Sequence, residues 1–274
     1  MKAIIPVAGI GSRFYPVSKS IPKEMLPIGN KPAIQLIVEE ALAAGADEVI
    51  IVTSPEKPAI MHYFTSDRAW LTRVLGKEKA TDSLEELDRI SKSVQFVFQH
   101  EQLGLGHAVL QAAEEMKGEK DPVLILLGDA LVKSDVPCSC ELVNISRKFG
   151  NASVVGLEQV PSEKVSRYGI VGGIPVQENL LKLNQLIEKP SPEIAPSNFA
   201  VAGRYLLDSC VFAYLSSCRA GYSGEIQLTD AIQHMLDSVP VYGYRYPGTR
   251  FDIGNPVGYR ETLMAFAYRE QNAC

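Results

Sequence analysis

Short apolar runs alternate with amphipathic segments in the first half of this 274-residue chain, and this alternation limits its fold more than any other feature. The apolar runs lie at residues 4–7, 48–53, 94–99, 123–127 and 152–157. The amphipathic segments lie at residues 32–44, 104–116 and 141–149, and each is followed by a glycine that can end a helix. This order predicts βα units, and therefore a mostly parallel sheet covered by helices on both faces. In such sheets, ligands bind beyond the carboxyl ends of the strands.

The loop after the first apolar run combines small residues with fixed positive charge. Gly9 and Gly11 let backbone N–H groups approach a phosphate closely, and Arg13 and Lys23 follow soon after. The loop lacks the GxxxxGK[ST] pattern of a P-loop, and Phe14 stands where a GxGxxG fingerprint needs its third glycine. A pair of glycines can also serve only to turn the chain. We expect an anion site that uses neither of these two standard motifs.

Composition restricts where the protein works and what it binds. The net charge of −5, with no basic block, disfavours duplex DNA, RNA and anionic membrane surfaces as partners. The chain start is interrupted too early by Pro6 and Gly9 for a signal peptide, and no apolar run nears the length of a membrane span. We therefore expect a cytoplasmic protein. Five cysteines, an odd number without a CxxC pair, predict free thiols and neither disulfides nor a metal cluster.

The remaining segments predict additions to one domain. Residues 66–92 are charged and predict two short surface helices broken at Gly76. Beyond Tyr168 the apolar runs become shorter, with glycine and proline between them, which predicts a subregion of extra strands. Residues 256–268 have helical periodicity, and no linker or repeat separates any of these segments.

A glycine-rich turn follows the third apolar run. Gln99 ends that run, and Gly104 and His107 begin the next predicted helix. An amide side chain offers a donor and an acceptor, which suits the edge of a pyrimidine, while Gly104 lets the backbone approach the ring. A polar residue at a strand end can also be merely solvated. A histidine in the first turn of a helix more often packs or caps than catalyses, so we expect a structural role for His107.

Asp129 follows the fourth apolar run and is a candidate metal ligand. A carboxylate at the carboxyl end of a parallel strand can hold Mg²⁺, which takes one or two carboxylates together with phosphate oxygens and water. The alternative role for Asp129 is an N-cap of the following segment. Asp252, where a short predicted strand meets a glycine turn, is the candidate second ligand.

Residues 6–32, PVAGIGSRFYPVSKSIPKEMLPIGNKP, resemble the opening of sugar-nucleotide pyrophosphorylases, and most closely that of the bacterial UTP–glucose-1-phosphate uridylyltransferases. Segments 188–190, 195–205 and 224–232 resemble the same family, so the resemblance spans most of the chain. It implies an α/β, Rossmann-like nucleotidyltransferase fold of the GT-A-like kind, in a single domain over residues 1–274. The implied parts are a nucleotide-binding part (roughly 1–150), a sugar-binding part (151–255) and a C-terminal helix (256–274).

The resemblance also implies a role for each matching residue. The implied catalytic residues are Arg13, Lys23 and Lys189. The implied nucleotide-binding residues are Ala8, Gly9, Gly11, Glu24, Gln99 and Gly104, the last two at uracil. The implied sugar-binding residues are Gly169, Glu188 and Gly203, and the implied Mg²⁺ ligands are Asp129 and Asp252. Glu225 and Asp230 also match, but acidic residues at a helix start equally satisfy the helix dipole.

The Glu188-Lys189 pair has a chemical reason to bind a second substrate. A carboxylate accepts hydrogen bonds from adjacent sugar hydroxyls, and a neighbouring lysine can hold a sugar phosphate against a triphosphate. A Glu-Lys dipeptide is common on protein surfaces, so the residues alone favour an ordinary surface position without a role in binding. The resemblance is what assigns Glu188 to the sugar and Lys189 to its phosphate.

The resemblance implies that UTP and glucose 1-phosphate react to UDP-glucose and pyrophosphate by Mg²⁺-assisted in-line displacement at the α-phosphorus. Neither a GxSxG motif nor a Cys/His signature is present, which agrees with chemistry that needs no protein nucleophile. Three alternatives stay open: a thymidylyltransferase that uses dTTP, a non-catalytic sugar-nucleotide-binding protein, and a nicotinamide-dependent oxidoreductase, which the missing third glycine disfavours. We also expect a homo-oligomer, either a dimer or a tetramer.

Overall fold

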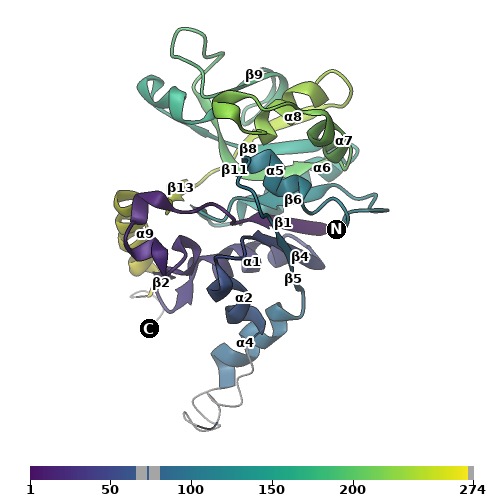
Figure 1. Ribbon diagram of the computed structural model, residues 1–274. Helices are drawn as coiled ribbons and strands as arrows, with labels where there is room; N and C mark the ends of the chain where they lie inside the picture. Colours follow the sequence, from purple (N-terminus) through teal and green to yellow (C-terminus); the bar gives the residue numbers. More distant parts are fainter. Residues whose placement is uncertain (66–72, 74–80, 271–274) are drawn as a thin grey trace.

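The computed structural model describes residues 1–65, 73 and 81–270 of the chain (Figure 1). Its strands are β1 (Lys2–Pro6), β2 (Pro27–Ile28), β3 (Lys31–Pro32), β4 (Glu48–Thr53), β5 (Val94–Phe98), β6 (Val123–Leu126), β7 (Ala130–Lys133), β8 (Ser153–Gln159), β9 (Gly169–Gln177), β10 (Leu180–Glu188), β11 (Phe199–Leu207), β12 (Val241–Arg245) and β13 (Thr249–Asp252). Its α-helices are α1 (Ala33–Ala43), α2 (Pro58–Thr65), α4 (Thr81–Ser91), α5 (Leu105–Leu110), α6 (Cys138–Lys148), α7 (Val211–Ser217), α8 (Leu228–Met235) and α9 (Pro256–Glu270). Short 3₁₀ helices include η1 (Ser12–Phe14), η2 (Val17–Lys19), η3 (Lys23–Met25) and η4 (Ser162–Arg167).

A nine-stranded sheet in the order β5-β4-β1-β6-β11-β8-β12-β10-β9 forms the centre of the molecule. Strands β5, β4, β1 and β6 pair in parallel, as the βα pattern predicts. Strand β11 is antiparallel to both β6 and β8, and β10 is antiparallel to β12 and β9. The sheet is therefore mixed: the N-terminal half has the predicted parallel pairing, whereas the C-terminal half pairs mainly antiparallel, with β8 and β12 as a parallel pair. Strands β9 and β10 pair antiparallel because the short turn between them leaves no room for a helical crossover.

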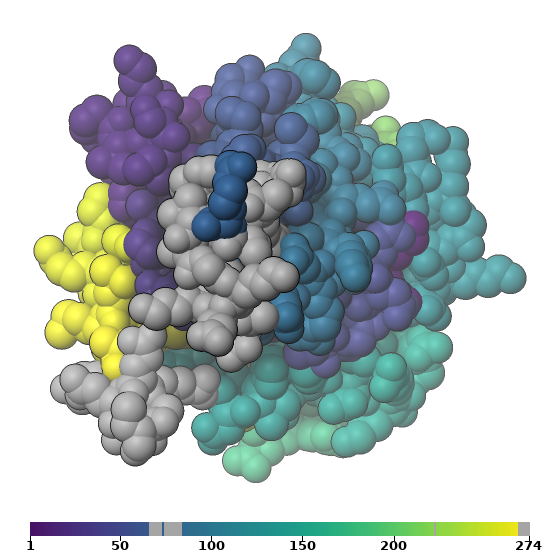
Figure 2. Space-filling view, turned by 90° about the horizontal axis from the view of Figure 1, so that it is seen from below, coloured from purple at the N-terminus to yellow at the C-terminus, as the bar shows by residue number. Residues whose placement is uncertain are grey.

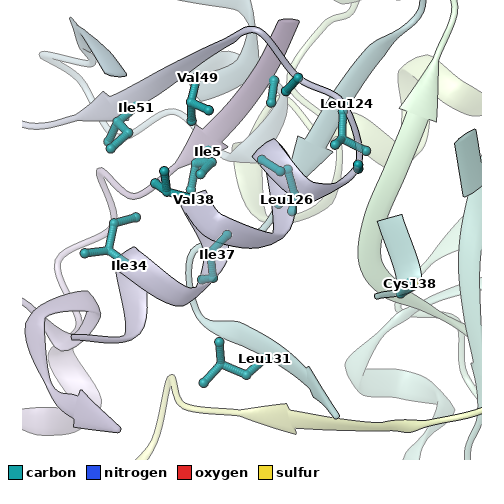
Figure 3. Close-up of a cluster of buried hydrophobic side chains, with 14 of the residues drawn as sticks. Ile5, Ile34, Ile37, Val38, Val49, Ile51, Leu124, Leu126, Leu131 and Cys138 are labelled. Atoms are coloured by element: carbon teal, nitrogen blue, oxygen red, sulfur yellow. The ribbon is translucent and has the colours of Figure 1, made fainter. Parts of the chain in front are cut away.

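Both faces of the sheet are covered, since successive side chains of a strand point to opposite faces. Ile5 of β1 packs with Ile34 and Ile37 of α1 on one face (Figure 3). Its neighbour Ile4 packs on the other face, in the apolar cluster that includes Val109 of α5. Each of these five side chains is 0 % exposed, so both layers belong to the buried core. This arrangement confirms the predicted helices on both faces.

The predicted helices appear with one difference in length. Helix α5 ends at Leu110, whereas the sequence predicts a helix as far as residue 116. From Gln111 onward the backbone bonds include i→i−3 pairs, such as Ala112 N to Val109 O at 3.1 Å, and the chain continues in turns to Gly118. The predicted helices over residues 66–92 correspond to α4 in their second part, while residues 66–72 and 74–80 lie outside the described residues.

The segment after β1 lies beside the last helix, as Figure 2 shows in purple and yellow. Phe14 packs edge-on against Tyr259 of α9 with ring centroids 6.2 Å apart, and the Tyr259 hydroxyl donates to Pro27 O at 2.8 Å. Helix α9 thus contacts the loops that follow the first strand. Among the described helices, none is long and apolar enough to cross a membrane. The described cysteines are free thiols, as predicted, and Cys274 lies outside the described residues.

One largely buried ion pair, with Arg204 at 0 % and Glu40 at 12 % side-chain exposure, joins four elements. The Arg204 guanidinium on β11 donates to both carboxylate oxygens of Glu40 on α1, at 2.9 and 2.8 Å. It also donates to Ala130 O at 2.8 Å, and Ser139 Oγ on α6 donates to Glu40 at 2.6 Å. Although burial opposes ionisation, Arg204 holds the pKa of Glu40 below its usual range. The pair is therefore charged and fully hydrogen-bonded.

Replacing Arg204 with methionine removes one partner of this pair and leaves Glu40 buried without compensation. We expect Arg204→Met to lower the free energy of unfolding by about 3–5 kcal/mol. Denaturant unfolding followed by circular dichroism measures this loss. The double variant Arg204→Met/Glu40→Leu is the control, because removing both charges should recover most of the loss. A single variant within about 1 kcal/mol of the wild type would contradict the assignment.

Candidate active site

A cavity of about 330 Å³ opens where β1, β5 and β6 end. Residues predicted for the site that line it are Ala8, Gly9, Lys23, Glu24, Gln99, Gly104 and Asp129. Other lining residues, among them Val7, Gln102 and Leu105, come from the same loops. These strand ends belong to the parallel part of the sheet, so the cavity lies at the edge where the βα pattern predicts ligands.

The glycine loop leaves its backbone open to the cavity. Nothing lies within 4 Å of the position where a Gly9 side chain would begin. Gly11 has a φ of 71°, a left-handed conformation that favours glycine, and its carbonyl accepts a hydrogen bond from Ser18 Oγ at 2.8 Å. Arg13 lies in η1, directly after this turn, and its side chain is 60 % exposed. The loop therefore offers an accessible backbone and an exposed cation to an anionic ligand.

Lys23 and Asp129 form an ion pair inside the cavity. Lys23 Nζ lies 2.5 Å from Asp129 Oδ2. Burial favours the neutral form of each group, but the opposite charge outweighs it: Asp129 raises the pKa of Lys23, and Lys23 lowers the pKa of Asp129. Both groups are charged at neutral pH. A phosphate that approaches Lys23 therefore competes with Asp129 for the same ammonium group.

Asp252 reaches Asp129 because β13 pairs antiparallel with β7. The register places Asp252 opposite Ala130, and Ile253 N donates to Asp129 O at 2.9 Å. Asp252 is held in turn by Gly254 N, which donates to its Oδ1 at 2.7 Å. The short ladder between β7 and β13 thus brings together two carboxylates that are far apart in the sequence.

The two carboxylates fit a hard divalent cation. The position where a Gly254 side chain would begin lies 2.8 Å from Asp252 Oδ1, 3.0 Å from Asp129 Oδ2 and 3.0 Å from Arg13 Nη2. Any larger residue would fill this space between the carboxylate oxygens. In the described part of the chain no group of three or more metal-ligating side chains occurs. A pair of carboxylates, completed by phosphate oxygens and water, is nevertheless the usual donor set for Mg²⁺.

Gln99 stands at the far side of the cavity, 3 % exposed and held by its neighbours. Its Nε2 atom lies 3.3 Å from Gly104 O and 2.9 Å from His107 Nδ1. His107 Nε2 lies 3.1 Å from Gln111 Nε2, so the histidine connects two amide side chains. This geometry gives His107 the structural role that we expect, as a support for Gln99.

A second group of predicted residues surrounds Glu188 at the ends of β9 and β10. Gly169 pairs with Glu188 across these strands, and Thr229 Oγ1 donates to Glu188 Oε2 at 2.8 Å. Lys189 has a φ of 47°, and its Nζ lies 3.1 Å from Glu188 Oε1. Gly169, Glu188 and Lys189 do not line the cavity described above. They form a neighbouring cluster, to which Thr229 adds a hydroxyl.

Tyr205 is a buried residue of β11. Burial raises the pKa of its hydroxyl, and the charges of Glu188 and Asp129 raise it further. Gly203, two residues earlier on β11, has a φ of 77° and its carbonyl accepts from Leu127 N at 3.0 Å. Gly203 therefore lies beside the residue that follows Asp129, since a Cβ on Gly203 would be 3.3 Å from Ala130 Cβ.

Some site residues have no sequence signal of their own. Lys57 bonds to Glu24 at 2.8 Å, Thr229 bonds to Glu188, and Arg250 stacks over Tyr168 with 5.0 Å between its guanidinium carbon and the ring centroid. Each contact joins residues far apart in the chain, which a local motif cannot reveal. Of the two acidic residues left open, Glu225 lines the cavity, whereas Asp230 lies in a separate pocket beside Cys218 and His234.

A mixed α/β sheet with a glycine loop, a lysine–carboxylate pair and two converging carboxylates at its strand ends is the arrangement of a nucleotide-binding α/β enzyme. Comparison with known sequences gives the family: the nucleotidyl transferase model matches residues 2–268, and the chain belongs to this family. The chain is 42 % identical over 272 residues to a UTP–glucose-1-phosphate uridylyltransferase of Staphylococcus haemolyticus, covering 98 % of this chain and 93 % of the relative.

The solved structures that the fold matches include UDP-glucose pyrophosphorylases. The fold matches a crystal structure of apo UDP-glucose pyrophosphorylase with a TM-score of 0.90 and 34 % identity over 98 % of each chain. A UTP-bound UGPase from Acinetobacter baumannii matches with a TM-score of 0.85 and 37 % identity, over 97 % of this chain and 92 % of that chain.

Gly104 tests the shape of the cavity, because a Cβ there would lie 2.7 Å from Ile226 O and 2.8 Å from Glu225 Cβ at a φ of +107°. We expect Gly104→Ala to lower the affinity for a nucleoside triphosphate at least about tenfold, as strain of about 1–3 kcal/mol moves the backbone. Calorimetric titration measures the affinity. Gly118→Ala is the matched control, since its φ is +82° with open space around the added carbon. Equal losses in both variants would contradict the prediction.

Proposed function

We propose that this chain transfers the uridylyl group of UTP to glucose 1-phosphate and forms UDP-glucose and pyrophosphate. The observation that carries the proposal is one cavity lined by the glycine loop, by Gln99 and by the Lys23–Asp129 pair. It occurs in a chain 42 % identical to a uridylyltransferase over nearly its whole length. The cavity can hold a base at one end and phosphates at the other.

In the proposed reaction, a phosphate oxygen of glucose 1-phosphate attacks the α-phosphorus of UTP in line. The bond between the α-phosphorus and the bridging oxygen to the β-phosphate breaks, and pyrophosphate leaves toward the glycine loop. Both substrates are anions, so the chief tasks of the protein are alignment and charge neutralisation. No group of the protein needs to form a covalent intermediate.

Each cation has a place in this scheme. Arg13 and Lys23 lie on the side of the glycine loop, where they neutralise the triphosphate and the leaving pyrophosphate. Lys189 lies beside Glu188, where it holds the phosphate of the sugar while Glu188 and the backbone of Gly169 position the hexose. Gln99 and Gly104 read uracil. Gly203 borders the sugar from β11.

Asp129 and Asp252 hold Mg²⁺ in the proposed site, and their converging oxygens are the basis for that assignment. When bound, the ion supplies Lewis-acid stabilisation of the charge that develops on the phosphates. If Asp129 were to hold the ion, Lys23 would be free to hold a phosphate. The present ion pair keeps both groups charged and in place until that exchange.

The thymidylyltransferase alternative is not favoured, because the matched uridylyltransferase and UDP-glucose pyrophosphorylases are 34–42 % identical to this chain, whereas a matched structure of a thymidylyltransferase is 24 % identical and supports the fold alone. We propose that the protein works in the cytoplasm and as a homo-oligomer, on the composition and on the resemblance respectively.

Pyrophosphate release is the first test. Purified protein with Mg²⁺, glucose 1-phosphate and each nucleoside triphosphate in turn should release pyrophosphate fastest with UTP, and a control without metal should release none. Faster release with dTTP would overturn the uridylyl assignment and leave the fold and mechanism in place. Binding of UTP without turnover would instead support the non-catalytic alternative.

Asp129→Asn tests the metal assignment, because an amide oxygen is a weaker ligand without charge. We expect kcat to fall by at least about 100-fold, with the affinity for Mn²⁺ reduced as well. Steady-state kinetics and metal titration followed by electron paramagnetic resonance measure the two effects. Asp135→Asn is the matched control, since Asp135 is exposed and lies outside the cavity lining. Unchanged turnover in Asp129→Asn would contradict a metal role for this residue.

A further inference from the structure

Lys57 is a buried lysine that the mechanism above does not use. It lies in the loop between β4 and α2, and 7 % of its surface is exposed. Its Nζ atom donates to Val7 O at 2.6 Å and to Glu24 Oε2 at 2.8 Å. A lysine buried to this degree is rare unless it is paired, so the two acceptors account for its position.

Both acceptors belong to the walls of the nucleotide cavity. Val7 and Glu24 line it, whereas Lys57 does not and so lies behind the wall. The sheet order explains the contact: β4 is the neighbour of β1, and Val7 N donates to Val52 O at 2.8 Å, so the loops after the two strands are adjacent. Lys57 therefore ties the start of the glycine loop to η3.

The turn η3 is thus held by two ion pairs: it supplies the cation of one pair and the anion of the other. Lys23 of this turn pairs with Asp129 at 2.5 Å, and the next residue, Glu24, pairs with Lys57. The first pair lies in the cavity and must open when a phosphate takes Lys23. In the second pair, Glu24 is part of the wall and Lys57 lies behind it.

Lys57 also compensates the negative charge of Glu24. Glu24 is an acidic group in the wall of a cavity that receives a triphosphate, and an uncompensated carboxylate there would repel the ligand. The ammonium group of Lys57 neutralises that carboxylate from behind. The cations that face the cavity then remain available to the phosphates.

We propose that Lys57 is a positioning residue for UTP, which acts through Glu24: it neutralises this carboxylate and holds η3 in place while Lys23 exchanges Asp129 for a phosphate. This inference rests on the proposed function. It assigns to Lys57 an effect on the nucleotide and none on the sugar phosphate, which binds beside Glu188 and Lys189.

The experiment compares Lys57→Met, Glu24→Gln and the double variant with the wild type. Calorimetric titration gives the dissociation constant for UTP in the presence of Mg²⁺, and steady-state kinetics gives the KM for glucose 1-phosphate. We expect Lys57→Met to weaken UTP binding at least about tenfold, because it leaves Glu24 buried and unpaired. The KM for glucose 1-phosphate should stay within about twofold of the wild type.

The double variant distinguishes positioning from a general structural effect. If Lys57 acts through Glu24, Lys57→Met/Glu24→Gln binds UTP as Glu24→Gln does, to within about threefold. This variant contains no unpaired charge, so it can be tested even if Lys57→Met alone does not fold. Lys31→Met is the matched control: Lys31 pairs with Glu39 and Glu86 away from the cavity, and its loss should leave UTP binding unchanged.

Three results would overturn the inference: wild-type UTP affinity in Lys57→Met, equal losses for both substrates, or fold-changes that multiply in the double variant. Failure of the proposed function looks different. It would appear as a wild-type protein that binds UTP and releases no pyrophosphate, while the binding data for the variants still test Lys57.

Discussion

The buried ion pair between Arg204 and Glu40 is the constraint on which the site geometry depends. Arg204 bonds to Glu40 on α1, to the carbonyl of Ala130 and to that of Gly203, and Ser139 on α6 completes the set. Ala130 directly follows Asp129, and β7 starts there. The charge pair thus fixes the backbone from which the first carboxylate projects. Because the pair is largely buried and each partner makes several hydrogen bonds, this backbone position is specified by strong, directional contacts as well as by apolar packing.

The lysines in and behind the wall of the cavity are paired with carboxylates. Lys23 is bound to Asp129 and Lys57 to Glu24, so an isolated ammonium group is avoided at both positions. The two pairs differ in location: one lies in the cavity and can exchange its partner for a phosphate, and the other lies behind the wall. Arg13 differs from both, since it is exposed and 3.9 Å from Asp252. The site therefore combines a fixed pair, an exchangeable pair and an exposed cation.

Much of the fold and half of the site follow from the sequence, for physical reasons that differ by element. Strands β1, β4 and β6 carry continuous apolar runs, and these runs predict their position and their burial on both faces, whereas the edge strand β5 is only partly buried. Gly9, Gln99 and Asp129 follow such strands directly, so their meeting at one edge could be predicted. Asp252 was predicted mainly from the resemblance, because its position before a glycine turn is a weak signal and the pairing of β13 with β7 leaves none. Lys57 was missed for the same reason: its partner Glu24 lies on a different segment.

The ladder between β7 and β13 has a consequence for synthesis of the chain. Asp129 belongs to the first half of the sequence, whereas Asp252 arrives on one of the last strands, just before α9. Contacts between such distant segments form late, since the loop between them must be ordered first. A nascent chain can form the early strands but lacks Glu225, which lines the cavity, and Asp252 until the C-terminal region has emerged. The reactive centre is therefore assembled last, and only a nearly complete molecule can handle its substrates.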